Sequence, residues 1–269
     1  MGYQFSVDIS NGIARIRDAL SGECMHATDP YQEAQHMYVA QSGLADLLKT
    51  RSQVTVWDVG LGAAANAMAA LNLANEISKG QLLLLSFERD LGSLQLALQH
   101  PNLFPYLDRH EPRKLLEHGR THSTSVSWCL MYGDFAEQAD GAPTPDIIFF
   151  DPFSLRTDGP MWSWPCIQML GRRLKARDGV LVTYSVSTAV RAGLLATGLW
   201  VAKGEGSGRR RESTIAVGPG NQAVRNWLGT EWIAKWRVSS AQFPFMVTHQ
   251  DNFSRCVREH PQFNGPSDA

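Results

Sequence analysis

Short runs of consecutive apolar residues, separated by longer segments of mixed polarity, dominate the chain from residue 54 onward. The runs have the length and composition of buried strands, and the segments between them carry apolar residues at helical spacing. This alternation predicts β-α-β units around a mostly parallel sheet. We place strands at residues 54–58, 82–87, 127–132, 146–151 and 180–185, and helices at 63–77, 91–99, 161–175 and 187–197.

The pattern differs towards the two ends of the chain. Near the start, two alternating segments flank an Asn-Gly pair at residues 11–12, which favours a tight hairpin. Residues 28–30, Thr-Asp-Pro, then supply a cap and a first-turn proline, so we predict a helix that continues to about Thr50. Segments 199–203 and 213–217 flank a glycine-rich turn and predict an antiparallel pair at one edge of the sheet.

These patterns divide the chain into three parts. We expect a hairpin-helix extension at residues 1–50, an α/β domain at 51–219 and a C-terminal extension at 220–269. The signals weaken after residue 220, and we predict a partly disordered tail beyond about His249.

Composition and charge narrow the class of protein. The chain has 269 residues, with 25 Lys and Arg against 26 Asp and Glu, so its formal net charge is −1. This balance excludes a protein that binds nucleic acid over its whole surface, although a local basic patch remains compatible with it. The 4 cysteines form no C-x-x-C pair and the 8 histidines show no metal-ligand spacing, so we expect reduced thiols and no metal. No apolar run approaches the ~18 residues that a membrane helix needs, and we predict a cytoplasmic protein.

Acidic residues follow the first four predicted strands of the sheet: Asp58, Glu88, Asp134 and Asp151. Ligands of open α/β folds bind at the carboxyl ends of the strands, so we expect these side chains to face one crevice. Carboxylates suit a ligand with a ribose, an adenine amino group and an ammonium group, which all donate hydrogen bonds. S-adenosylmethionine carries all three groups. Each acid taken alone is also compatible with a helix cap, Asp134 in particular.

Gly60 and Gly62 lie in the turn that follows the first of these acids. Glycines at such a turn allow a ligand to approach the backbone closely. The motif also fits dinucleotide-binding proteins, in which an acid about 20 residues further on binds the ribose. Here the acid at the end of the second strand, Glu88, lies 28 positions after Gly60. No anchor for a pyrophosphate is evident, and S-adenosylmethionine is therefore favoured.

Aromatic residues surround the acid that follows the fourth strand. Phe153 and Trp162 come shortly after Asp151 in the sequence. A carboxylate at a strand end can accept a proton from an amine, while aromatic rings face the developing positive charge. We therefore predict that Asp151 is catalytic and that Phe153 and Trp162 contact an amine substrate. The alternative is that these rings belong to the core and that Asp151-Pro152 forms only a turn.

Two basic clusters are candidates for phosphate contacts. Arg209, Arg210 and Arg211 follow three closely spaced glycines, a combination that suits phosphates. A second cluster contains Arg172, Arg173, Lys175 and Arg177. For this second cluster, a solvated face or a complement to the helix dipole is equally compatible with the pattern.

In their order, these motifs resemble the S-adenosylmethionine-dependent methyltransferase domain of the MnmC family, which completes 5-methylaminomethyl-2-thiouridine at the tRNA wobble position. The resemblance runs from about Gly22 to Val217. It is carried by Pro30 to Val39 with Glu33, the glycine turn followed by Asn66, Ser86 to Arg89, Gly133-Asp134, Phe150 to Trp162, Thr183 to Ser185, Val190 to Leu194 and Gly206 to Glu212. It implies a Rossmann-like fold of seven strands, a tRNA partner, and a substrate amine near Asp151. The cofactor site that we predict comprises Asp58, Gly60, Gly62, Asn66, Glu88 and Asp134.

The chain departs from the family pattern at two places. Pro152 stands where the family usually has glycine, and Ala63-Ala64 where it usually has Thr-Gly. Two-domain members also carry an FAD-dependent oxidase domain, which 269 residues leave no room for, so we expect methyl transfer alone.

The prediction is methyl transfer from S-adenosylmethionine to the exocyclic amine of 5-aminomethyl-(2-thio)uridine in tRNA. One alternative is a methyltransferase or aminopropyltransferase that acts on another amine. A second is an inactive module that binds RNA or a partner on the same scaffold.

Overall fold

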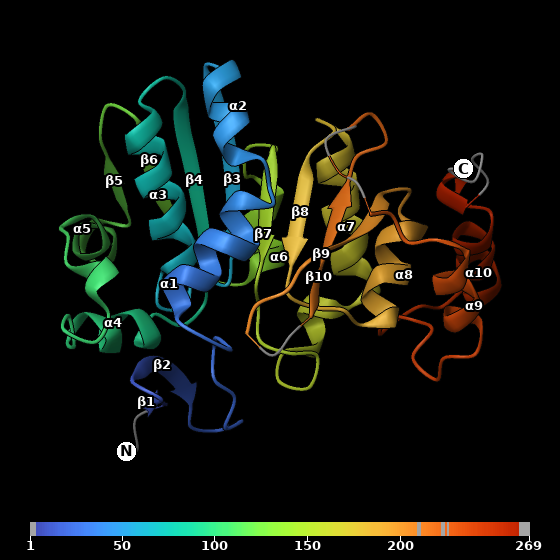
Figure 1. Ribbon diagram of the computed structural model, residues 1–269, viewed down its shortest axis with the longest axis horizontal. Helices are drawn as coiled ribbons and strands as arrows, with labels where there is room; N and C mark the ends of the chain where they lie inside the picture. Colours follow the sequence, from blue (N-terminus) through green and yellow to red (C-terminus); the bar gives the residue numbers. More distant parts are fainter. Residues whose placement is uncertain (1–3, 209–210, 222–223, 225, 264–269) are drawn as a thin grey trace.

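A twisted sheet of eight strands forms the centre of the molecule, in the order β5-β6-β4-β3-β7-β8-β10-β9 (Figure 1). The computed structural model describes residues 4–208, 211–221, 224 and 226–263. The strands are β3 (Gln53–Val59), β4 (Gln81–Glu88), β5 (Arg120–His122), β6 (Val126–Tyr132), β7 (Ile147–Phe150), β8 (Val180–Thr183), β9 (Trp200–Glu205) and β10 (Glu212–Val217). The neighbours from β6 to β8 pair in parallel, which confirms the mostly parallel Rossmann-like sheet.

The two edges of the sheet are antiparallel. β10 pairs antiparallel with both β8 and β9, as predicted for this edge. At the opposite edge, β5 pairs antiparallel with β6 and adds an eighth strand to the seven that were expected. Only the central residue of β5, Thr121, is buried. A strand of three residues with one buried position has no alternating pattern that sequence analysis can detect.

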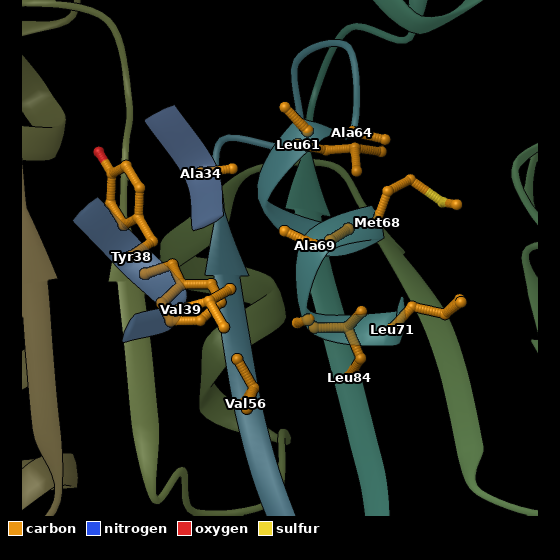
Figure 2. Packing of buried hydrophobic residues seen from close by; sticks show 14 of the residues in the cluster. Ala34, Tyr38, Val39, Val56, Leu61, Ala64, Met68, Ala69, Leu71 and Leu84 are labelled. Atoms are coloured by element: carbon orange, nitrogen blue, oxygen red, sulfur yellow. The ribbon is translucent and has the colours of Figure 1, made fainter. Parts of the chain in front are cut away.

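Helices cover both faces of the sheet. Together with the short helical turns, they are α1 (Pro30–Glu33), η1 (Ala34–Ala40), α2 (Leu44–Thr50), α3 (Ala65–Ile77), α4 (Gly92–Leu98), η2 (Pro105–Leu107), α5 (Glu111–His118), α6 (Phe135–Asp140), η3 (Gly159–Trp162), α7 (Trp164–Lys175), α8 (Thr188–Ala196), α9 (Thr230–Arg237), α10 (Gln250–Arg258) and η4 (Pro261–Phe263). Val56 and Leu84 pack with Met68 of α3 on one face, whereas Trp57 and Phe87 belong to the core of the other face (Figure 2). Burial on both faces explains why the central strands are continuously apolar.

The N-terminal segment packs against the carboxyl edge of the sheet (Figure 1). β1 (Phe5–Ser10) and β2 (Ile13–Asp18) form the predicted hairpin, and Asn11 and Gly12 in its turn both have positive φ, 53° and 76°. The helix predicted to run to Thr50 is interrupted at Gly43, where φ is 72°. Left-handed backbone at this glycine ends one helical segment and begins α2.

The C-terminal segment packs on the far end of the sheet. We expected a partly disordered tail beyond about His249, and this was wrong for residues 250–263, which form α10 and η4. Phe253 and Val257, one helical turn apart, are buried, and Phe253 packs against Trp164. In the sequence, these two apolar residues stand among charged neighbours, so the pattern was too weak to predict a helix here. Residues 264–269 lie outside the described part of the chain, and the three domain boundaries stay a prediction.

Candidate functional site

A crevice lies at the carboxyl edge of the sheet, between the loops that follow β3, β4, β6 and β7. The N-terminal segment closes one side of it. The crevice brings together seven of the predicted site residues, which are Gly60, Gly62, Asn66, Glu88, Asp134, Asp151 and Phe153.

The glycine turn after β3 forms the floor of the crevice. Gly60 has a φ of +90°, and a Cβ atom at this position would lie 2.6 Å from the carbonyl oxygen of Asp151. Glycine is therefore required here both for its backbone conformation and for the close approach of the next loop. Gly62, with a φ of +53°, donates its backbone N–H to Glu88 Oε2 at 3.1 Å. The glycine turn therefore lies against the backbone of the loop after β7 and hydrogen-bonds the Glu88 side chain.

Glu88 ends β4 at the rim of this floor. Its carboxylate also accepts the backbone N–H groups of Arg89 at 2.8 Å and Asp90 at 3.0 Å. Burial raises the pKa of Glu88, and the three backbone donors oppose that effect. The hydrogen bonds fix the orientation of the carboxylate at the place where ligands of this fold bind.

Asp134 caps α6 and faces the crevice at the same time. Its Oδ1 accepts the backbone N–H groups of Ala136 at 2.9 Å and Glu137 at 3.4 Å. The helix-cap interpretation of this residue is therefore confirmed. Its side chain is exposed and remains accessible to a ligand.

Asp151 follows β7 and lines the crevice. Its backbone N–H bonds to Val59, and its Oδ2 accepts the side-chain amide of Asn66 at 2.9 Å. Burial raises the pKa of Asp151 to about 6, and the nearby His26 opposes this shift. Asn66 Oδ1 is buried without a hydrogen-bond partner in the described part of the protein. A carboxylate with such a pKa can exchange a proton near neutral pH.

Asp58 and Trp162, which were predicted to contact ligands, do not line the crevice. Asp58 is fully buried beneath it and accepts a 2.7 Å hydrogen bond from Ser86, whose hydroxyl in turn accepts the Trp128 indole N–H. Burial raises the pKa of Asp58 to about 7. Trp162 is also fully buried, and its indole N–H donates to the Phe153 carbonyl at 2.8 Å. The position in the sequence suggested contact with a ligand, but side-chain direction places both residues in the interior.

The two basic clusters lie at opposite edges of the sheet. Arg211 is exposed immediately before β10, which starts at the carboxyl end of β8, whereas Arg209 and Arg210 lie outside the described residues. In the other cluster, Arg177 contacts Asp146, which precedes β7. Arg173 donates to the carbonyl of Ala139 at 2.7 Å. These contacts give Arg173 and Arg177 structural roles, away from the crevice.

Residues that the sequence analysis did not assign come from the N-terminal segment. Glu23 accepts hydrogen bonds from the Ser154 backbone at 3.1 Å and from the Ser154 and Thr157 hydroxyls, both at 2.8 Å. It thereby holds the loop after Asp151. Next to it, Met25 and His26 also line the crevice. The segment has no periodic pattern, and its only signal was its inclusion in the family resemblance.

Two kinds of site were not found in the residues that the structure describes. No group of three or more His, Cys, Asp or Glu side chains is arranged to hold a metal ion. No described helix has both the length and the apolar character needed to cross a membrane.

Comparisons with known proteins identify related sequences. Residues 106–219 match the profile of a family described as S-adenosyl-L-methionine-dependent methyltransferase. The chain is 29% identical over 213 residues to the tRNA 5-methylaminomethyl-2-thiouridine biosynthesis bifunctional protein MnmC of Caulobacter vibrioides, covering 74% of this chain and 35% of that protein. It is 28% identical over 236 residues to the protein of the same name from Aromatoleum aromaticum, covering 78% and 36%. The chain thus spans about a third of the length of these relatives.

The fold has a close counterpart among solved structures. The crystal structure of MnmC2 from Aquifex aeolicus superposes with a TM-score of 0.73 at 20% identity, over 97% of this chain and 85% of that one. The sheet order, the crevice with its glycine turn and strand-end acids, and the sequence similarity lead to one conclusion. The chain is an S-adenosylmethionine-dependent methyltransferase whose domain is similar to that of the MnmC proteins.

Proposed function

We propose that the protein methylates the exocyclic amine of 5-aminomethyl-(2-thio)uridine at the wobble position of tRNA. The observation that carries the proposal is Asp151, a carboxylate with a pKa of about 6 that lines the cofactor crevice. A methyltransferase that acts on an amine needs a group that holds the ammonium and removes its proton. The names of the two MnmC relatives supply the nucleoside.

The residues of the crevice fit S-adenosylmethionine. Gly60 and Gly62 line the crevice without side chains of their own, so a ligand can lie against the turn, and the Glu88 carboxylate has the chemistry to accept hydrogen bonds from ribose hydroxyls. The unpartnered Asn66 oxygen is a further acceptor, buried beside the crevice. When bound, the cofactor supplies a methyl group on a positively charged sulfur.

Asp151 and Phe153 would position the substrate. Asp151 hydrogen-bonds the incoming ammonium and accepts one of its protons, which frees the amine lone pair. The reaction is a direct displacement, so the amine must be held in line at about 3 to 3.5 Å from the methyl carbon, an alignment worth several kcal/mol of the barrier. Phe153, half-buried in the wall of the crevice, presents an aromatic ring near the developing charge.

The glycine-arginine segment supplies the contact with tRNA phosphates in this proposal. Arg211 lies at the same edge of the sheet as the crevice, and Arg209 and Arg210 precede it in sequence. With a net charge of −1, the protein needs a local basic patch to hold a polyanion.

The test is nucleoside analysis by mass spectrometry. Purified protein, S-adenosylmethionine and tRNA that bears 5-aminomethyl-2-thiouridine should yield the 5-methylaminomethyl nucleoside. The Asp151→Asn variant should bind S-adenosylhomocysteine but form little product. Methylation of a small amine with none of tRNA would favour the alternative acceptor. Transfer of an aminopropyl group from decarboxylated cofactor would identify an aminopropyltransferase.

A further inference from the structure

A buried His-Glu pair lies beside Asp151 and has no role in the function described so far. His26 lines the crevice, and its Nδ1 is 3.3 Å from Glu33 Oε1. The side chains are 7% and 3% exposed. A buried histidine and carboxylate interact more strongly than an exposed ion pair, because less water screens their charges. Buried ionisable groups that line a crevice are candidates for a functional role.

Glu33 fixes the chemistry of the imidazole. Its Oε2 accepts hydrogen bonds from the Ala27 N–H at 3.3 Å, the Thr28 hydroxyl at 3.2 Å and the Ser207 hydroxyl at 3.0 Å. These donors stabilise the ionised carboxylate. An ionised Glu33 requires a proton on Nδ1 of His26, so the basic lone pair of the neutral ring is on Nε2. Buried Glu33 also stabilises the positive charge that the ring acquires on protonation.

His26 interacts electrostatically with Asp151. A positive imidazole lowers the pKa of the Asp151 carboxyl, and Glu33 raises it. By reciprocity, the charge on Asp151 favours protonation of the ring. Other ionisable groups near the pair or Asp151 include Tyr38 on η1, Tyr184 after β8, and Glu23 and Cys24 on the same segment as His26. The buried Asp58 also interacts electrostatically with Asp151.

We propose that His26 is a proton relay for Asp151 and that Glu33 is its positioning residue, an inference that rests on the proposed function. Asp151 takes one proton from the substrate ammonium, and the amine lone pair then forms the N–C bond as the S–C bond breaks. The proton passes from the Asp151 carboxyl to Nε2 of His26, which leaves a carboxylate and an imidazolium paired with Glu33. The imidazolium releases it to solvent. One proton leaves per methyl group transferred, and Asp151 is ready for the next substrate.

Three variants separate a relay from a structural role. His26→Gln should lower kcat by about 10- to 100-fold, less than the roughly 10²- to 10⁴-fold typical for loss of the group that itself takes the proton from substrate, because Asp151 is still present. It should also move the acid limb of the kcat profile to higher pH, because the positive neighbour of Asp151 is removed. The affinity for S-adenosylhomocysteine should change less than about threefold. His26→Ala should regain part of its activity when imidazole is added. Ser207→Ala removes a hydroxyl that contacts Glu33 Oε2 and the Thr28 hydroxyl but keeps His26, Glu33 and Asp151, so it should leave the acid limb in place.

A measurement without substrate distinguishes failure of the relay from failure of the proposed function. In the full-length protein, NMR titration of labelled histidine should show the His26 midpoint at lower pH in both Asp151→Asn and Glu33→Gln than in the wild type. Ser207→Ala should shift it much less. An unchanged midpoint in Asp151→Asn would overturn the relay, whatever the substrate. If the wild type is active, a His26→Gln variant that keeps full kcat would also overturn the relay. So would the absence of both a shifted acid limb in His26→Gln and imidazole rescue in His26→Ala. If the His26 midpoint shifts as expected but the protein does not methylate tRNA, only the proposed tRNA substrate is refuted.

Discussion

Asp146 and Asp151 stand at the two ends of the same strand, β7, and the protein treats them in opposite ways. Asp146, 2% exposed, accepts hydrogen bonds from the Thr55 N–H at 2.8 Å and from Arg51 at 2.6 Å, and Arg177 lies 3.4 Å away. Asp151 has one side-chain amide at 2.9 Å, from Asn66, and its pKa is raised by burial to about 6.

The comparison shows that the neighbours of a buried carboxylate decide whether it stabilises the fold or can take part in chemistry. At the amino edge, two arginines and a backbone N–H compensate the charge of Asp146. These contacts connect β7 with β3 and with the end of α7. At the carboxyl edge the compensation is incomplete, so the group retains the capacity to bind a proton or an ammonium. The two residues differ in their neighbours, and this makes them a matched pair for experiment.

The largest expected effect is on catalysis by Asp151→Asn. An amide of the same shape cannot take the proton from the substrate, so we expect kcat to fall by roughly 10²- to 10⁴-fold. Affinity for S-adenosylhomocysteine, measured by calorimetry, should remain nearly unchanged. Asp146→Asn is the control and should retain kcat under conditions where it is folded. Equal loss of turnover and cofactor affinity in Asp151→Asn would indicate a structural role.

Asp146→Asn should act on stability instead. The amide keeps an acceptor for Thr55 but loses the charge that Arg51 and Arg177 contact. We expect the free energy of unfolding to fall by roughly 1.5 to 3 kcal/mol, the scale of a hydrogen bond to a charged group. Urea denaturation followed by tryptophan fluorescence measures this change. A variant as stable as the wild type would show that the two arginines contribute little here.

Glu88 combines the features of both aspartates, since it accepts backbone donors and also faces the crevice. Glu88→Ala should weaken binding of S-adenosylmethionine by roughly 1.5 to 3 kcal/mol through loss of a charged hydrogen bond to the ribose. Calorimetry on variant and wild type provides the comparison. Binding of NAD in preference to S-adenosylhomocysteine would contradict the assignment of Glu88 to this cofactor.

Removal of the Asp151 charge should make the protein more stable at alkaline pH. Because the folded-state pKa of about 6 lies above the ordinary aspartate value of 3.8, stability from this group is fully present below about pH 4 and is lost as the pH rises through 6. At pH 8, Asp151→Asn should therefore raise the free energy of unfolding by roughly 1 to 3 kcal/mol. The gain should disappear near pH 4. A gain that persists unchanged at acid pH would have another cause.

The smallest expected effect concerns the arginines at the crevice edge. Replacement of Arg209, Arg210 and Arg211 by Ala should flatten the dependence of tRNA affinity on salt, by about 0.7 to 0.9 in log-log slope for each phosphate that is no longer neutralised. Arg177→Ala, at the opposite edge, should leave the slope unchanged. Wild-type affinity and slope in a triple variant that folds and binds cofactor normally would remove this segment from the RNA site.

Local sequence was sufficient for much of the fold. The apolar runs predicted the five parallel strands to within a few residues because most of their residues are buried between the two helical layers; β6, near the edge, is only partly buried. The Asn-Gly pair predicted the hairpin because its two residues tolerate positive φ. Strand β5 and helix α10 were missed, since each depends on one or two buried residues that find partners only in the assembled protein.

The sequence by itself determined which acids stand at strand ends and that the glycine turn precedes a helix. Tertiary structure alone decided which of them face a ligand. Asp58 and Asp151 follow neighbouring parallel strands, yet one points into the interior beneath the sheet edge and the other into the crevice. His26 and Glu33 acquire their relation to Asp151 only when the N-terminal segment packs on that edge. The free energy of a charge is set by all the groups that surround it in space, and most of these are distant in sequence.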